Sequence, residues 1–196
     1  ALLLKEIGSD KKVYGFDSFD GFPSYSKFDA LENYSAYRGV TFSEEFLAER
    51  ERFLSVKKIL TGLEMFDPVS IASSGSFDGT SKESLVQKIE YFELDNVHLV
   101  QGDFRETVPN FFSENENVKI CSANIDCDLY DGYKLVLPIV YDRLSSSGYV
   151  NLDEYYSFKY PGAKIACDEF FAESGIRPEQ NDARVGEFER WYFTKI

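Results

Sequence analysis

The feature that most constrains the fold is a set of short apolar segments that each end on acidic residues. These segments read as β-strands because they are rich in β-branched and aromatic residues and are followed by Gly, Pro or Asp turns. They occupy residues 12–19, 96–104, 118–132 and 145–156. Segments with helical spacing separate them, so each strand can return to the sheet only through a crossover connection. The sequence therefore predicts a mainly parallel α/β sheet.

The intervening segments carry helix signals. Apolar residues recur at helical spacing, and Ser43, Ser81 and Gly175 stand at positions typical of helix caps. The predicted helices cover residues 43–60, 81–92, 133–144 and 163–174, and a Gly/Ser-rich loop covers 73–82. The closing segment, 188–196, is predicted to be an antiparallel or edge strand. We expect residues 1–196 to form a single domain of Rossmann-like architecture, with helices on both faces of the sheet.

Acidic residues stand at the carboxyl end of every predicted parallel strand. In open α/β sheets, ligands bind outside the carboxyl ends of the strands. One such carboxylate would be unremarkable in a chain with a net charge of −13, but four equivalent strand ends indicate a shared site. The residues concerned are Asp17, Asp103, Asp126 with Asp128, and Asp153 with Glu154.

The acids of the third and fourth strands are candidates for a metal site. Mg²⁺ prefers oxygen ligands and commonly uses a few carboxylates, which leaves positions for water and substrate. Asp126, Asp153 and Glu154 would form such an open site, and a cation would relieve their mutual repulsion. The alternative is that these acids cap the following helices, an alternative that is strongest for Asp128. Zinc is disfavoured because the cysteines lack ligand spacing.

The acids of the first two strands are candidates for nucleotide binding. A carboxylate at the position of Asp17 typically accepts hydrogen bonds from two ribose hydroxyls in nucleotide-binding α/β folds. Gly102 allows the backbone to approach a ligand closely, and Asp103 could accept from an adenine amino group or a ribose hydroxyl. Turns use the same Gly-Asp pair without any ligand.

Composition limits the class of partner. The net charge of −13 argues against a nucleic acid or an anionic membrane as the main partner. Three cysteines without a CxxC pair fit reduced thiols better than a disulfide framework. No apolar run approaches the length of a membrane span, and the initial ALLL is too short for a secretory signal. We expect a cytoplasmic protein with no nucleic-acid or membrane partner, and a homo-oligomer remains open.

Several motifs together carry a resemblance to a known family. They are FDSFDGFP, QGDFRETVP, IDCDLYDGY, SSGYVNLDEYYSFKYPGAKIACDEF and RWYF, in this order from about residue 11 to the C-terminus. With them the chain resembles the macrocin O-methyltransferase (TylF-like) family, whose members transfer a methyl group from S-adenosylmethionine to sugar hydroxyls of antibiotics and related compounds.

The resemblance implies roles for individual residues. Asp17 and the adjacent Ser18 would hold the ribose of S-adenosylmethionine, and Gly102, Asp103 and Phe104 would lie on the adenine side. Asp126, Asp153 and Glu154 would bind Mg²⁺, the same residues that the strand-end pattern selects. As a ligand, Asp126 is also placed to be the catalytic group that accepts the proton of the acceptor hydroxyl, and the neighbouring carboxylates are alternatives for this role. The implied substrate is a small molecule that contains a sugar.

The chain departs from the family pattern in three places. Glu154 stands where the family usually has Asp. Residues 24–80 are less alike, and this segment is expected to be either a lid or insertion that selects the substrate, or a packing element. The family also uses a first strand with a glycine-rich turn, whereas residues 1–8 already match the helix that follows it, so we expect upstream sequence.

Two other functions fit part of the pattern. A nicotinamide-dependent oxidoreductase would use Asp17 equally well but would not need the acids at 126, 153 and 154. A non-catalytic binding protein with a methyltransferase-like fold would tolerate the loss of the first strand. Tyr130 and Tyr155 could line an acceptor pocket, but we interpret them as packing residues, and we interpret His98 as an ordinary strand residue.

Overall fold

The computed structural model describes residues 1–72, 77, 79, 81–181 and 189–195. Most of the predicted loop at 73–82 and the first and last residues of the predicted closing strand, 188 and 196, lie outside the described residues. The chain forms two compact units, Ala1–Pro23 with Ser76–Glu116, and Ser24–Gly75 with Asn117–Ile196. The expectation of a single domain stays a prediction. Among the described residues, no helix combines the length and the apolar character needed to span a membrane.

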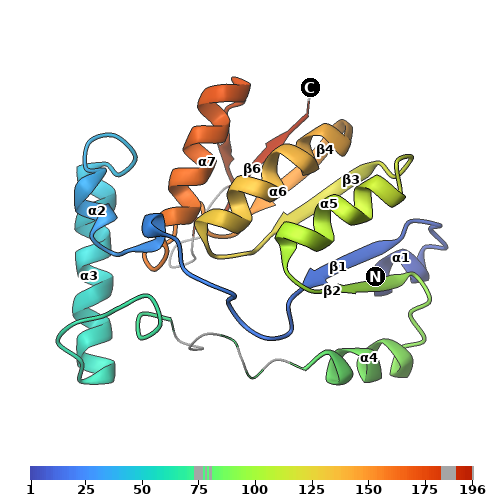
Figure 1. Cartoon of the computed structure of the whole chain (residues 1–196), viewed down its shortest axis with the longest axis horizontal. Coiled ribbons are helices and arrows are strands. Elements are labelled where there is room, and N and C mark those ends of the chain that lie inside the picture. Colours follow the sequence, from blue (N-terminus) through green and yellow to red (C-terminus); the bar gives the residue numbers. More distant parts are fainter. Residues whose placement is uncertain (73–76, 78, 80, 182–188, 196) are drawn as a thin grey trace. The chain divides into compact units, whose positions relative to one another are not determined.

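The first unit is built on a pair of parallel strands. Strand β1 (Val13–Asp17) pairs with β2 (Val97–Gln101), and the register places Asp17 opposite Gln101. The structure therefore confirms that these two segments are parallel strands, each shorter than predicted (Figure 1). The same unit contains α1 (Leu2–Glu6) and α4 (Lys82–Tyr91), and the Ser81 hydroxyl caps α4 by accepting from Ser84 N as expected.

A helix that the sequence analysis did not predict follows β2. Helix α5 (Phe104–Glu114) begins at its N-cap Asp103 and packs against β1. Its buried residues, Val108 and Phe112, are four positions apart and thus lie on one face of the helix. Pro109 inside the helix weakens the sequence signal, because proline removes a backbone donor. The N-cap at Asp103 and the four-residue apolar spacing were nevertheless available signals.

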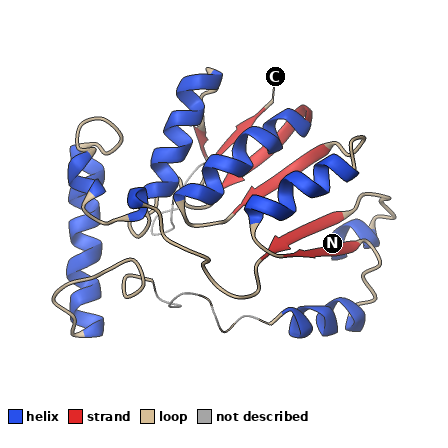
Figure 2. Ribbon diagram, viewed as in Figure 1, coloured by secondary structure: helices blue, strands red, loops and turns tan. Residues whose placement is uncertain are grey.

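The second unit contains a four-stranded sheet in the order β3-β4-β6-β5. Strands β3 (Ile120–Ile125) and β4 (Leu144–Leu152) are parallel, and helix α6 (Tyr130–Arg143) forms the crossover between them. Strand β6 (Trp191–Thr194) runs antiparallel to β4, which confirms the antiparallel alternative for the closing segment (Figure 2). Strand β5 (Glu179–Gln180) pairs with the other side of β6, so β6 is not at the edge.

The core of this unit lies between the sheet and helices α6 and α7 (Pro161–Ser174). The two helices pack against each other, and Gly175 ends α7 in the left-handed conformation that was expected of it. Fully buried apolar residues come from both helices and all three long strands of the unit. They include Ile125, Leu137, Val150, Leu152, Ala166 and Phe193. Burial of this kind holds the ends of β3 and β4 in a fixed arrangement.

Residues 24–72 contain helices that are joined to α7 by buried packing. The segment contains a short 3₁₀-helix, η1 (Lys27–Asp29), followed by α2 (Asn33–Ala36) and the long helix α3 (Glu44–Thr61). A second aromatic core joins them to Ile165 of α7, and its other buried members are Tyr34, Phe42, Phe46 and Leu47. Part of residues 27–61 is thus packed against α7. A role in substrate selection stays a prediction.

Replacement of Phe46 tests whether α3 is anchored. Its ring is buried and contacts Tyr34, Phe42, Tyr156 and Phe158. We expect Phe46→Ala to lower the free energy of unfolding by about 3–5 kcal/mol, as measured by urea denaturation. Ile59→Ala is the matched control, because Ile59 lies on the same helix and is 82% exposed. Equal, small effects of the two substitutions would mean that α3 does not contribute to the core.

Candidate active site

The ends of β3 and β4 lie side by side. Ile125 is paired with Leu152, and the amide of Asp153 donates to the carbonyl oxygen of Ile125 over 3.0 Å. The acidic residues that follow the two strands therefore start from neighbouring backbone positions. This confirms the predicted crossover, in which one helix and one returning strand bring the two acid motifs to the same end of the sheet.

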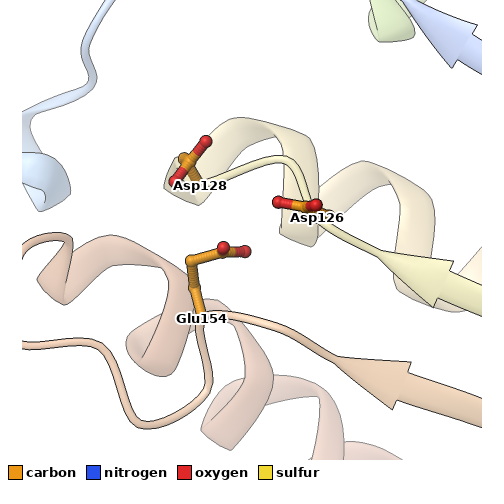
Figure 3. Close-up of side chains that lie close together, drawn as sticks. All are labelled: Asp126, Asp128 and Glu154. Carbon is orange, nitrogen blue, oxygen red and sulfur yellow. The ribbon is translucent and has the colours of Figure 1, made fainter. Parts of the chain in front are cut away.

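Three carboxylates gather at these strand ends. Ligand atoms of Asp126, Asp128 and Glu154 all lie within 4.8 Å of one another. Asp126 and Asp128 come from the loop between β3 and α6, and Glu154 comes from the turn after β4 (Figure 3). Asp126 is exposed, Asp128 is partly buried and Glu154 is buried, so the cluster is open to solvent on one side.

The structure brings together two of the three predicted metal ligands, Asp126 and Glu154, and places Asp128 with them. Asp153 instead forms an ion pair with Arg190, with 2.6 Å between Oδ1 and Nη1. The reason is the alternation of side chains along an extended chain. Val150, Leu152 and Glu154 are buried, whereas Asn151 and Asp153 are only partly buried. Glu154 therefore continues the buried face of β4, and Asp153 continues the opposite face.

Neither Asp126 nor Asp128 is the N-cap residue of α6. The N-cap residue of α6 is Leu129, whose side chain makes no capping hydrogen bond. Asp128 also has a positive φ of 58°, a conformation uncommon for a residue other than glycine although better tolerated by Asp than by most. The backbone of the loop thus holds the Asp128 side chain beside the other two acids rather than at the helix terminus.

The cluster is electrostatically unfavourable without a cation. Burial, followed by the charge of Asp128, raises the pKa of Glu154. Burial, followed by the charge of Asp126, likewise raises the pKa of Asp128. Both shifts have the causes expected when carboxylates are crowded in a poorly solvated place. A bound divalent cation would favour the ionised forms, so the donor set fits a hard cation such as Mg²⁺.

The hydroxyl of Tyr133 can support either protonation state of Glu154. It lies 2.7 Å from Glu154 Oε2 and 2.9 Å from the carbonyl oxygen of Ile125, and it accepts from the Glu154 amide. With one proton, the hydroxyl donates to only one of the two oxygens at a time. When Glu154 is ionised, its carboxylate can accept the hydrogen bond from the Tyr133 hydroxyl, because the Ile125 carbonyl oxygen still accepts from the Asp153 amide. When Glu154 is protonated, its carboxyl group can donate a hydrogen bond to the Tyr133 oxygen, and the Tyr133 hydroxyl then donates to the Ile125 carbonyl oxygen.

A pocket of about 190 Å³ adjoins the cluster. Asp128, Asp153 and Glu154 line it together with residues that the sequence analysis did not select, namely Phe53, Tyr156, Ser157, Phe158, Lys159, Tyr160, Glu189 and Arg190. Phe53 belongs to α3, so residues 24–80 contribute to the pocket wall. The available sequence signal was the FKY run at 158–160, which follows the acid pair after three intervening residues and combines aromatic rings with a cation.

Tyr130 and Tyr155 are packing residues, as interpreted from the sequence. Tyr155 is buried in the core, and its hydroxyl donates to Asp168 over 2.8 Å. Tyr130 stacks on Phe28 and donates to Glu169. His98 is a residue of β2 and stacks on the ring of Tyr14, as expected for a strand residue.

The predicted cofactor residues gather at the ends of β1 and β2 in the first unit. Asp17 is exposed at the end of β1, and its Oδ1 accepts from Phe19 N over 2.7 Å. The amide of Gly102 donates to the carbonyl oxygen of Asp17 over 2.9 Å. Gly102 has a φ of +135°, which requires glycine here, and Ser18 Oγ donates to Gly21 O. The exposed carboxylate of Asp17 is therefore accessible to a ligand.

Asp103 has local partners. Its carboxylate accepts from the amide of Arg105, as the N-cap of α5, and also pairs with the Arg105 guanidinium at 2.5 Å. The Arg105 side chain holds the pKa of Asp103 below its usual value. In this structure Asp103 therefore caps α5, a role that the sequence analysis did not assign to it. Contacts of Asp103 and of Phe104, the first residue of α5, with a nucleotide stay predictions.

The raised pKa of Glu154 predicts how stability depends on pH when cations are removed by a chelator. A glutamic acid whose pKa is raised on folding makes its full contribution to stability below about pH 4.3, the pKa of the unfolded state. This contribution is lost as the pH rises through the pKa of the folded state. Glutamine at this position stays neutral. We therefore expect Glu154→Gln to raise the melting temperature at pH 8 and to change it much less at pH 4, and pH-independent differences would contradict the assignment.

Comparison with known proteins places the chain in a family. A model of the macrocin-O-methyltransferase (TylF) family matches residues 74–185. No curated protein matches at a significant level. Similar solved structures include the calicheamicin methyltransferase CalS11, with 23% identity over 93% of this chain and 60% of that chain and a TM-score of 0.61. The O-methyltransferase NovP has 19% identity over 98% of this chain and 64% of that chain, with a TM-score of 0.64. Apo CalS11, described as a TDP-rhamnose 3'-O-methyltransferase, has 18% identity over 98% of this chain and 75% of that chain, with a TM-score of 0.54.

These structural similarities, all below 25% identity, establish the fold. The chain spans 60% and 64% of the length of the first two solved structures. The family match covers more than half of the chain and includes the cluster of Asp126, Asp128 and Glu154. The chain belongs to the macrocin-O-methyltransferase (TylF) family.

Proposed function

We propose that this protein is an S-adenosylmethionine-dependent O-methyltransferase that uses a divalent cation and acts on a hydroxyl of a sugar or glycosylated small molecule. One observation carries the proposal. Two parallel strands of a TylF-family chain bring their terminal carboxylates within 4.8 Å of one another, beside a pocket lined by aromatic and charged residues. A nicotinamide-dependent oxidoreductase would leave this acidic cluster without a purpose.

The cation would be held by Asp126 and Glu154, with a third carboxylate from Asp128 or Asp153. Asp128 is already beside them, whereas Asp153 would first have to leave Arg190. When bound, Mg²⁺ would lower the pKa of an acceptor hydroxyl and fix its orientation. Asp126 is the most exposed member of the cluster, and we assign to it the role of accepting the hydroxyl proton.

The residues at the ends of β1 and β2 would hold S-adenosylmethionine, which supplies the methyl group. We assign the ribose hydroxyls to the exposed carboxylate of Asp17, with Ser18 beside it. Gly102, whose conformation brings bare backbone to the strand end, would approach the nucleoside closely together with Asp103 and Phe104.

The pocket beside the cluster suits a sugar. Phe53, Tyr156 and Phe158 offer apolar ring faces, and Lys159 and Arg190 offer hydrogen-bond donors. Binding sites for small molecules combine apolar walls with a few placed polar groups in this manner. The names of the two CalS11 structures, a calicheamicin methyltransferase that acts on TDP-rhamnose, describe a sugar acceptor for that protein. We extend the sugar class, but not the particular sugar, to this chain.

The activity is tested by methyl transfer with and without cation. We expect S-adenosylhomocysteine to be released when nucleotide-linked or free deoxysugars are offered as acceptors, and we expect release to stop on chelation and return with Mg²⁺. Asp126→Asn should remove most of the activity while the circular dichroism spectrum stays unchanged, because the substitution removes a ligand and the proton acceptor. Activity that survives complete chelation would contradict the role of the cation.

The cofactor assignment has a separate test. We expect Asp17→Ala to weaken binding of S-adenosylhomocysteine by about 1–3 kcal/mol in calorimetry, because a charged hydrogen-bond acceptor is lost. Asp20→Ala is a suitable control, since Asp20 lies three residues away, beyond the strand end. Unchanged affinity in Asp17→Ala would contradict the ribose assignment. Tight binding without methylation of any sugar would favour the non-catalytic alternative.

A further inference from the structure

Helix α6 receives its N-terminal cap from a distant part of the chain. Its own N-cap residue, Leu129, has no side chain able to accept a hydrogen bond. Instead, Oδ1 of Asp29 accepts from the amide of Tyr130 over 2.8 Å, across 101 residues of sequence. A carboxylate at this position satisfies a backbone donor that the helix leaves unpaired, and it interacts favourably with the helix dipole.

Asp29 is completely buried and is held in place by its own turn. Its Oδ2 accepts from the amide of Ser26 over 2.8 Å, and Ser26 Oγ accepts from Phe28 N, so η1 has a reciprocal capping box. Burial raises the pKa of Asp29, and the hydrogen bonds from the amides of Tyr130 and Ser26 oppose this shift. Both oxygens of the carboxylate are thus used, one within its own segment and one on α6.

The start of α7 leaves space for this carboxylate. A Cβ atom on Gly162 would lie 2.1 Å from Asp29 Oδ1 and 2.8 Å from Tyr130 Cβ. Any larger residue at this position would therefore displace the carboxylate or the first turn of α6. The Phe28 ring adds a second contact, since it stacks on the Tyr130 ring with 4.2 Å between centroids. The segment before α2 is thereby fixed between α6 and α7.

The capped amide comes directly after the loop that carries two of the clustered acids. That loop, residues 126–129, is joined to β3 at one end and to α6 at the other. Strand β3 is fixed by its pairing with β4, and Tyr130 is fixed by Asp29. Within this short span Asp128 keeps its uncommon positive φ. A loop of four residues with both ends held has few alternative conformations.

We propose that Asp29 is a positioning residue of the cation site, which it serves by fixing Tyr130 and so the backbone that directs Asp126 and Asp128 toward Glu154. This inference rests on the cation site proposed above and adds to it a residue from the segment expected to be a lid or insertion. The segment at 26–29 is accordingly part of the framework of the site. Residues that fix the orientation of metal ligands commonly have a strong effect on metal affinity although they do not contact the metal.

Calorimetric titration of Mn²⁺ and Mg²⁺ into the cation-free protein tests the proposal. We expect Asp29→Ala to weaken cation binding by about tenfold or more, the usual effect of losing a residue that orients a ligand. Ser26→Ala is the matched control, because it disturbs the same turn but leaves the bond between Asp29 and Tyr130. It should keep the affinity of the wild type. Both variants are compared at a temperature at which circular dichroism shows them folded.

Two further variants keep the test decisive if Asp29→Ala folds poorly. Asp29→Asn retains one oxygen that can accept from Tyr130 N, so its affinity should lie closer to that of the wild type. Gly162→Ala places a methyl group against the carboxylate and should weaken cation binding while Asp29 itself is kept. The inference is overturned if the wild type binds the cation and all these variants bind it equally well. A wild type that binds no cation would overturn the proposed cation site as well.

Discussion

The parallel pairing of β3 with β4 is the constraint on which the site depends. Because Ile125 and Leu152 are neighbours in the sheet, the residues that follow them must share one small region. The buried core beneath, with Leu137, Val150 and Phe193 among its members, fixes this pairing. Backbone geometry therefore brings together carboxylates that are separated and solvated in the unfolded chain, and apolar burial supplies the free energy that opposes their repulsion in the folded protein.

The crowding of these acids has a functional meaning only if the cluster is preorganised. Glu154 is oriented by Tyr133, whose hydroxyl also contacts Ile125, so the acid and the strand end share one hydrogen-bond network. On the other side, Asp29 holds the start of α6 behind Asp126 and Asp128. The Glu154 carboxylate and the backbone next to the 126–129 loop are thus each held by hydrogen bonds. The cluster stays open to solvent at the exposed Asp126. A rigid donor set of this kind favours a small divalent cation, because little reorganisation is needed on binding.

Much of this arrangement follows from local sequence patterns. Alternating strands and helices predict the parallel pairs, and the strand-end acids predict that Asp126 and Glu154 meet. The position of Asp153 apart from the cluster depends on side-chain alternation. Val150, Leu152 and Glu154 share the buried face of the strand, and Asp153 continues the opposite face. Asp29 could not be found in this way, because its contact with Tyr130 spans 101 residues and depends on how η1 packs between two helices. Helix α5 was missed because Pro109 obscured an apolar spacing that was present.

We propose above that Asp126 and Glu154 hold a divalent cation at the ends of β3 and β4. Crystals grown with Mn²⁺ test it most directly, since anomalous scattering locates the metal independently of the protein. We expect one strong peak within coordination distance of carboxylate oxygens from both residues, and the same map would show whether Asp128 or Asp153 is the third ligand. An ordered acidic cluster with no anomalous peak, or a peak bound elsewhere, would contradict it.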